Sequence, residues 1–258
     1  MFLLSFDIEE FDMPFEYGKN ISFEDQITIS VTGTRIILDL LAKHNLKATF
    51  FSTVVFAQNA PEIILRIKNE GHELASHTYY HSKFEVPHLL SSKLELEKLS
   101  GLPVNGFRMP RMMPVPESEI AAAGYTYNSS INPTWLPGRY NNLHVSRTYF
   151  KLENVWQLPA SVSPMFRIPL FWLSFHNFPL AIYKYLIKRT YKKDGYVNIY
   201  FHPWEFSDLT DTERFGFPGY VSKNSGKAME KRMDDLMSWI TSQKYKCETI
   251  NTFMSGLK

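Results

Sequence analysis

Short apolar runs alternate with longer amphipathic stretches along most of the chain. The short runs are rich in Phe, Val, Ile and Tyr, which suit a pleated surface and predict β-strands. We predict strands at 2–7, 47–52, 72–77, 104–108, 125–130, 154–160, 197–202 and 245–250. Stretches with apolar residues at helical spacing lie between them and predict helices at 34–45, 61–71, 89–101 and 227–243. Such alternation favours a parallel α/β fold, either a barrel or a doubly wound sheet.

The pattern shows no repeat, low-complexity tract or linker, so we predict one domain over residues 1–258. Residues 132–153 are rich in Pro, Gly and Asn and predict a long excursion over the surface. The most apolar stretch, 164–187, is interrupted by an arginine, a histidine and two prolines, which a membrane span tolerates poorly. We interpret it as a lid or a subunit interface, with core packing as the alternative. Its aromatic side chains include Phe166, Phe171, Trp172, Phe175 and Phe178.

Composition narrows the class of protein further. A net charge of +2 predicts no strong field for nucleic acid or membranes, and the basic run at 187–193 fits a solvated helix end. The single cysteine, Cys247, excludes an internal disulfide and fits a reducing compartment. Residues 1–12 turn from apolar to acidic early, which indicates a strand and not a signal peptide. We therefore expect a cytoplasmic protein with no transmembrane segment and no nucleic-acid partner.

Polar residues recur where predicted strands end. Asp7, His77, Arg108 and His202 each close an apolar run. In parallel α/β folds the carboxyl ends of the strands meet at one rim, where binding and catalytic groups collect. Four separate strands would thus deliver an acid, two imidazoles and a guanidinium to one place. Core packing alone is a poor explanation for that coincidence.

Two histidines four residues apart, His77 and His81, stand in the segment "HTYYH". A helical turn there would place both rings on one face, within reach of one ion. Zinc and similar divalent metals bind imidazole readily, usually with a carboxylate. Taken alone, this spacing often arises by chance, and a surface histidine beside a loop-capping one is the simpler interpretation.

Carboxylates are concentrated in "FDIEEFD" at 6–12, directly after the first strand. Their mutual repulsion calls for a metal ion or for one protonated acid. Asp7 and Glu9 share one side if the strand persists. A solvated acidic loop is the alternative, and it fits Glu10 and Asp12 better than Asp7.

Arg108 and His202 each allow two interpretations. Arg108 either pairs with a buried carboxylate and keeps it ionised, or is a surface arginine before a turn. His202, followed by Pro203 in "IYFHPWEF", is either a general acid or a core histidine bonded to the backbone.

In chain order, "SFDIEE", "HTYYH", "RMP", "GYTYNSS" and "IYFH" resemble the motifs of the polysaccharide deacetylases of carbohydrate esterase family four. That family includes chitin-oligosaccharide and peptidoglycan deacetylases. The motifs span residues 5–202, and "HELASHTYYH" with "FHPWEF" makes the resemblance specific. The sequence "HPWE" resembles the motif of one branch of this family, which is associated with capsule or exopolysaccharide synthesis. The resemblance implies a distorted (β/α) barrel of about seven parallel strands.

The resemblance also implies roles for individual residues. Asp7 matches the general base, Arg108 the arginine that positions it, and His202 the general acid. His77 and His81 match the metal-ligand pair of the family.

One position departs from the family pattern. Ile8 stands where a second aspartate is usual, so Glu9 is the candidate third ligand. Zn²⁺ is the expected ion.

The implied activity is metal-dependent removal of N-acetyl or O-acetyl groups from a sugar or glycan precursor, in cell-surface polysaccharide biosynthesis. Arg111, just after "RMP", adds positive charge at the rim and suggests an anionic or otherwise unusual substrate. A backbone N–H near it is a candidate oxyanion donor.

Two alternatives remain open. One is a cyclic-amide hydrolase like the allantoinase relatives, some of which need no metal; the intact histidine pair argues against it. The other is a non-catalytic glycan-binding relative, which the joint presence of Asp7, Arg108 and His202 disfavours.

Overall fold

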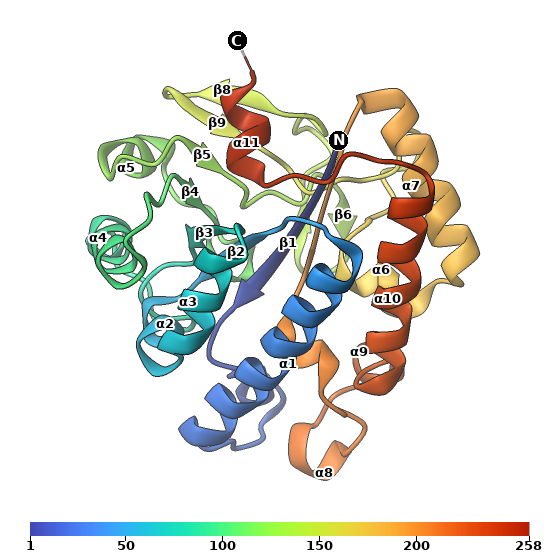
Figure 1. The fold of residues 1–258 in the computed structure, drawn as a ribbon, viewed down its shortest axis with the longest axis horizontal. Helices are drawn as coiled ribbons and strands as arrows, with labels where there is room; N and C mark the ends of the chain where they lie inside the picture. Colours follow the sequence, from blue (N-terminus) through green and yellow to red (C-terminus); the bar gives the residue numbers. More distant parts are fainter. Residues whose placement is uncertain (258) are drawn as a thin grey trace.

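A curled sheet with helices packed around its outside forms the body of the protein (Figure 1). The computed structural model describes residues 1–257. Seven parallel strands run in the order β10-β1-β2-β3-β4-β5-β9, and β8 pairs antiparallel with β9 at the edge. The distorted barrel predicted from the resemblance is therefore confirmed. The strands are β1 (Phe2–Ile8), β2 (Thr49–Ser52), β3 (Glu73–Ser76), β4 (Gly106–Phe107), β5 (Tyr127–Asn128), β8 (Phe150–Leu152), β9 (Val155–Gln157) and β10 (Val197–Phe201).

All four predicted helices form, as α1 (Phe23–His44), α3 (Pro61–Asn69), α4 (His88–Ser100) and α10 (Lys227–Ser242). Helix α1 begins well before the predicted residue 34, because the Ser22 hydroxyl caps it by accepting from the Asp25 N–H at 3.1 Å. The other helical elements are α2 (Val54–Asn59), α5 (Glu117–Ala122), α6 (Trp172–Asn177), α7 (Leu180–Asp194), α8 (Thr212–Phe215), α9 (Gly219–Ser222), α11 (Ile250–Ser255) and the short turns η1 (Met13–Tyr17), η2 (Pro110–Met112) and η3 (Pro203–Phe206).

The predicted strand at 245–250 is wrong. Only Cys247 makes a bridge there, to Phe2 at the edge of β1. Thr249 instead caps α11 by accepting from the Thr252 N–H at 3.2 Å, which turns the chain into a helix.

Successive side chains of β1 point to opposite faces of the sheet, one toward the helices and the other toward the inside of the barrel. Phe2, Leu4 and Phe6 join the main apolar core under the helices. Leu3, Ser5 and Asp7 face the inside of the barrel, where Leu3 packs with a second apolar cluster. Asp7 therefore stands at the carboxyl end of β1 with its side chain toward the barrel interior.

A glycine in the middle of α1 allows an unusually close approach to η3. A Cβ atom on Gly33 would lie 1.9 Å from the carbonyl oxygen of Pro203. No side chain fits in that space, so the helix and the turn that follows His202 are in direct backbone contact.

The stretch 132–153 is a largely exposed excursion, as predicted, and contains the hairpin β6 (Trp135–Leu136) and β7 (Tyr140–Asn141). The stretch 164–187 divides into three environments. Phe175 lies in the main core, Phe171 and Trp172 line a cavity, and Phe166 is 75% exposed. Within residues 1–257, no helix has the length and apolarity needed to cross a membrane.

His72, the first histidine of "GHELASHTYYH", belongs to the core and not to the site. Its Nδ1 accepts from the Ala48 N–H at 3.3 Å, and burial, with the nearby Lys47 charge, lowers its pKa to about 4. Because the folded state resists protonation, stability is lost as the pH falls below the ordinary histidine pKa of 6.5 toward 4. The loss at about pH 5 is on the order of 2 kcal/mol.

When the pH is lowered from about 7 to about 5, we expect the free energy of unfolding to fall less in His72→Asn than in the unsubstituted protein. Urea unfolding at both pH values measures this difference. The exposed His144 gives the matched control His144→Asn. Equal losses in the His72 variant and the unsubstituted protein would contradict the assignment.

Candidate active site

A buried ion pair stands at the centre of the barrel rim. Arg108 is fully buried, and its Nη1 donates to Asp7 Oδ1 at 2.5 Å. Its other donors reach Ser5 Oγ at 3.0 Å, Ser129 O at 3.0 Å and Ser129 Oγ at 3.1 Å. The guanidinium also lies 4.0 Å from the ring centre of Phe51. Arg108 is therefore held on several sides, and it fixes the carboxylate of Asp7.

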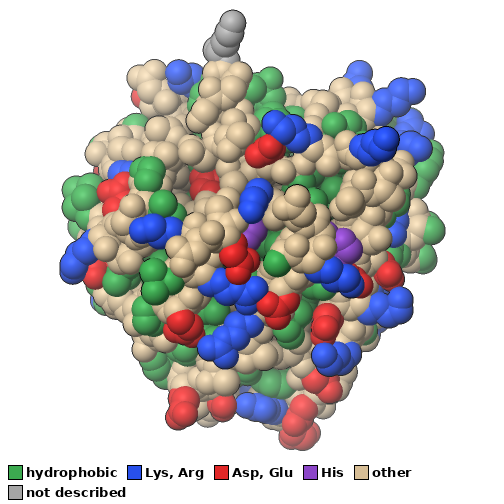
Figure 2. Space-filling model, viewed as in Figure 1, with side chains coloured by type: hydrophobic (Ala, Val, Ile, Leu, Met, Phe, Trp, Pro, Cys, Tyr) green, Lys and Arg blue, Asp and Glu red, His purple; other side chains and the backbone are tan. Residues whose placement is uncertain are grey.

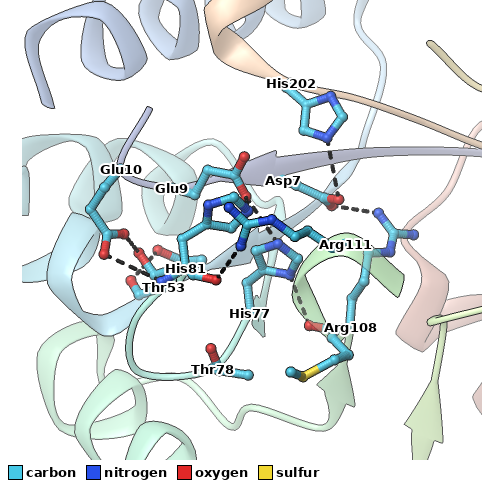
Figure 3. Close-up of polar contacts among 12 residues, drawn as sticks. Asp7, Glu9, Glu10, Thr53, His77, Thr78, His81, Arg108, Arg111 and His202 are labelled. Carbon is cyan, nitrogen blue, oxygen red and sulfur yellow. Dashed lines mark hydrogen bonds and ion pairs between the residues drawn. The ribbon is translucent and has the colours of Figure 1, made fainter. Parts of the chain in front are cut away.

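Glu9, His77 and His81 converge beside this pair (Figure 3). One ligand atom from each lies within 4.8 Å of the other two, and all three residues are buried. Glu9 Oε2 is 3.0 Å from His77 Nε2 and 3.1 Å from His81 Nε2. The same oxygen has no hydrogen-bond partner of proper geometry within residues 1–257, an expensive state for a buried carboxylate.

The outer nitrogens of both rings are already engaged. His77 Nδ1 lies 2.8 Å from the Arg108 carbonyl and His81 Nδ1 lies 2.6 Å from Asp12 Oδ1. Because a carbonyl and a carboxylate only accept, each Nδ1 carries the proton and each Nε2 can present a lone pair toward Glu9. This arrangement of an oriented imidazole with an engaged second nitrogen is typical of metal ligands. The donor set, two imidazoles and a carboxylate with an unsatisfied oxygen, fits a divalent ion such as zinc.

Electrostatics favour charge in this cluster. Burial raises the pKa of Glu9, but the charge of His81 and the close approach of His77 outweigh it and lower the pKa to about 2. Burial lowers the pKa of His81, yet Glu9 and Asp12 more than compensate and raise it. The site therefore holds Glu9 as a carboxylate that needs a positive partner.

Two local predictions are corrected. "HTYYH" is not a helical turn but a loop, and Thr78 takes a left-handed backbone conformation with φ of 67°. The two histidines share a face because this bend returns the chain, not because of helical spacing. Glu10 and Asp12 are not in a solvated loop: they are 7% and 6% exposed. Glu10 accepts from the Thr53 hydroxyl and Asp12 holds His81, so both organise the site.

His202 lies across the cavity from the metal-type cluster. Its Nε2 is 3.9 Å from Asp7 Oδ2, and its ring stacks on Trp204 with centroids 4.7 Å apart. Behind it, Glu205 Oε1 accepts from the His202 N–H at 2.6 Å and lies 3.1 Å from its Nδ1. The other Glu205 oxygen is 2.9 Å from His176 Nε2, and His176 and Glu205 are fully buried. Glu205 thus bridges His176 and His202 and holds the candidate acid in place.

Glu205 raises the proton affinity of His202. Burial lowers the pKa of His202, but the hydrogen bond to Glu205, with the negative charge of Glu9, more than offsets it, and the pKa is raised. If His202 is the general acid, activity falls as the pH rises through that pKa. We expect Glu205→Gln to shift this alkaline limb to lower pH, because the negative charge beside His202 is lost.

The rate of Glu205→Gln across pH, beside that of the unsubstituted protein, tests this expectation. Glu213→Gln is the matched control, because the Glu213 side chain is 96% exposed. An alkaline limb that stays in place would show that Glu205 does not act on the proton of His202.

These groups border a cavity of about 110 Å³. Asp7, Glu9, His77, His81 and His202 line it, whereas Arg108 lies beneath its wall. The rest of the wall mixes apolar or aromatic side chains with polar ones. The former are Met13, Met109, Met112, Leu136, Tyr140, Phe171, Trp172, Leu173, Tyr200 and Trp204, and the latter are Glu16, Arg111, Asn132 and Arg139. All six residues predicted from the sequence are therefore gathered at one place. Asp12, His176 and Glu205 are supporting residues that the sequence pattern did not predict.

Arg111 is not free at the rim. Its Nε donates to Glu16 Oε1 at 2.5 Å, its Nη2 lies 3.4 Å from Asp12 Oδ1 and its Nη1 donates to His81 O at 3.0 Å. Two carboxylates balance its charge, so it carries no argument for an anionic substrate. It instead ties the β1–η1 loop to the loop of His81.

Comparison with known proteins agrees with this architecture. Residues 19–126 match the family model of polysaccharide deacetylases. Over 61 residues the chain is 44% identical to a peptidoglycan-N-acetylglucosamine deacetylase from Bacillus cereus, which covers 24% of this chain and 22% of that protein. The chain thus spans about a fifth of the length of such curated relatives.

Solved structures share the fold at low identity. A probable polysaccharide deacetylase from Pseudomonas aeruginosa PAO1 superposes with a TM-score of 0.63 at 14% identity, covering 96% of this chain and 87% of that one. A pseudoenzyme of carbohydrate esterase family four from Bacillus anthracis gives a TM-score of 0.52 at 13% identity, covering 98% and 64%. The chain has the deacetylase-type fold. The match of residues 19–126 to the family model of polysaccharide deacetylases confirms the resemblance read from the motifs.

Proposed function

We propose that this protein is a metal-dependent hydrolase that removes N-acetyl or O-acetyl groups from a sugar or glycan precursor. The observation that carries the proposal is the convergence of Asp7, Glu9, His77, His81 and His202 on one cavity. A carboxylate pinned by a buried arginine, a metal-type donor set and a supported histidine are the parts that acyl hydrolysis requires.

Each group has a chemical role in the proposal. Asp7, held by Arg108, accepts the proton of the attacking water. His202, whose Nδ1 side faces Glu205, donates a proton to the departing amine or alcohol from Nε2. The aromatic part of the wall, which includes Trp172 and Tyr200, limits the access of bulk water to this proton transfer.

Glu9, His77 and His81 would hold the ion, and Zn²⁺ suits two imidazoles and a carboxylate. A divalent ion in this place supplies Lewis acidity toward the acyl oxygen and lowers the pKa of water. Asp12 and the Arg108 carbonyl hold the two rings in the orientation that such binding needs.

Metal content gives a direct check on these ligands. We expect the protein purified without chelators to hold about one divalent ion, and His77→Ala and His81→Ala to lose it together with turnover. Elemental analysis of each folded variant measures this. His88→Ala is the control, because His88 lies outside the cavity lining. Unchanged metal content in both site variants would refute the ligand assignment.

Acetate release across acetylated sugars, nucleotide-sugars and oligosaccharides, with and without chelator, tests the activity itself. Chelator-sensitive release supports the proposal. Turnover of cyclic amides without acetate release would favour an allantoinase-like hydrolase. Glycan binding with no turnover would place the chain with the pseudoenzymes.

The wider setting is also part of the proposal. A role in cell-surface polysaccharide biosynthesis is supported by the family match and by the "HPWE" sequence at 202–205. One catalytic domain over 1–258 and a cytoplasmic location stay predictions, which limited proteolysis and cell fractionation test.

A further inference from the structure

The net charge of the whole chain is only +2, but one stretch of it carries positive charge alone. Residues 154–193 contain six Lys or Arg and no Asp or Glu. Arg167 and Lys184 are engaged locally, since both donate to backbone carbonyls. The other four, Lys188, Arg189, Lys192 and Lys193, are exposed on α7.

The exposed face of α7 changes character along its length. Ile182 and Tyr185, 51% and 57% exposed, come first. The four cations follow as two adjacent pairs, Lys188 with Arg189 and Lys192 with Lys193, about one helical turn apart. Arg189 donates to the Tyr185 hydroxyl at 3.1 Å, and within residues 1–257 neither it nor the three lysines form an ion pair. The face therefore combines apolar surface with uncompensated positive charge.

A neighbouring loop extends the apolar part. Met165 and Phe166 are 70% and 75% exposed, unusual for such large apolar side chains. Together with Tyr185 and Arg189 they border one hollow, so the loop and the helix form a single surface. Figure 2 shows Lys and Arg side chains gathered over the α7 side of the molecule, with hydrophobic side chains beside them. We call this surface the α7 patch: Met165, Phe166, Ile182, Tyr185, Lys188, Arg189, Lys192 and Lys193.

We propose that the α7 patch docks the protein on the surface of an anionic lipid bilayer. Exposed aromatic and aliphatic tips enter the interfacial zone, while adjacent Lys and Arg attract acidic headgroups. A second copy is a poorer occupant, because a twofold contact would place the four cations against themselves. The patch needs a partner that is both negatively charged and apolar, and a lipid surface offers both.

Docking at this place acts on the segment that borders the candidate active site. The loop of Phe166 continues directly into Phe171 and Trp172, which line the cavity. The α7 patch and one wall of the cavity are therefore parts of the same continuous stretch of chain. None of the residues of the α7 patch lines the cavity, so the patch can bind lipid whether or not the protein is a deacetylase.

Flotation of the full chain with lipid vesicles tests the proposal. We expect binding to phosphatidylglycerol–phosphatidylcholine vesicles, little binding to pure phosphatidylcholine, and release at high salt. Lys188→Gln/Arg189→Gln/Lys192→Gln/Lys193→Gln should lower the partition coefficient by about 10²-fold or more. Met165→Ser/Phe166→Ser should weaken binding while leaving the salt dependence in place.

The control removes equal charge elsewhere. Lys83, Lys98, Lys227 and Lys231 have side chains 70%, 75%, 91% and 78% exposed, and their fourfold change to Gln should bind like the unsubstituted protein. Circular dichroism confirms that each variant folds. Three results would overturn the proposal: no flotation of the unsubstituted protein, equal binding by the α7 and control variants, or concentration-dependent dimerisation that the α7 variant abolishes without any vesicle binding.

Discussion

Asp7→Asn is expected to lower the turnover number by about 10²–10⁴-fold, the usual worth of a positioned general base. Asparagine keeps the shape of aspartate and one oxygen that accepts from Arg108 Nη1, now 2.5 Å from Asp7 Oδ1. It cannot take a proton from water. Metal content and substrate affinity should be retained, since Glu9, His77 and His81 are unchanged. Single-turnover kinetics with elemental analysis separates these effects.

Glu10→Gln provides the comparison for this experiment. Glu10 is also a buried acid after β1, but its carboxylate accepts from Thr53 and the His81 N–H instead of facing the cavity. We expect it to affect the rate far less than Asp7→Asn. A near-normal rate in Asp7→Asn would refute the assignment of the base, and a dead Glu10 variant would transfer the role to Glu10.

Arg108→Ala is expected to cost roughly 3–5 kcal/mol of unfolding free energy, because it leaves a buried carboxylate without its counter-charge. For a chain of this length the melting temperature should fall by on the order of 10 °C. The side chain is fully buried and bonds to Asp7, Ser5 and Ser129. Thermal and urea unfolding measure the loss. Lower activity in this variant therefore reports on folding as well as on the position of the base.

A double variant distinguishes charge from packing. If the unpaired Asp7 charge causes the damage, Arg108→Ala/Asp7→Asn should be more stable than Arg108→Ala alone. Arg35→Ala is the surface control, because Arg35 and Glu62 are both more than half exposed and their pair should be worth less than about 1 kcal/mol. A double variant no more stable than Arg108→Ala would show that lost packing against Phe51, not charge, dominates.

The fold was predictable wherever one local signal dominated. Apolar runs such as that of Phe2 to Ile8 form strands because both of their faces are buried. Helix α7 was missed because aliphatic and aromatic residues occupy nearly all sides of its first half, which gave no periodic polar face. The 245–250 run failed for a different reason: the cap by Thr249 outweighs the strand tendency of its neighbours.

The sequence predicted those residues of the candidate site that directly follow a strand. Asp7, Arg108 and His202 follow apolar runs, and parallel strands bring their ends together. Asp12 and His176 carry no such signal, because their positions depend on how loops and α6 fold back over the rim. The loop at "HTYYH" shows the same limit, since the positive φ of Thr78 is set by tertiary contacts.

Gly33 illustrates how a residue without chemistry constrains a site. In the middle of a helix, glycine costs about 1 kcal/mol relative to alanine, so its place in α1 needs a reason other than flexibility. The reason is space: the carbonyl of Pro203 occupies the volume that any side chain would fill. In a related sequence, a glycine at this position therefore indicates that the turn after His202 packs directly against the backbone of α1. A larger residue there would indicate a chain whose candidate acid stands elsewhere, even with every site residue intact.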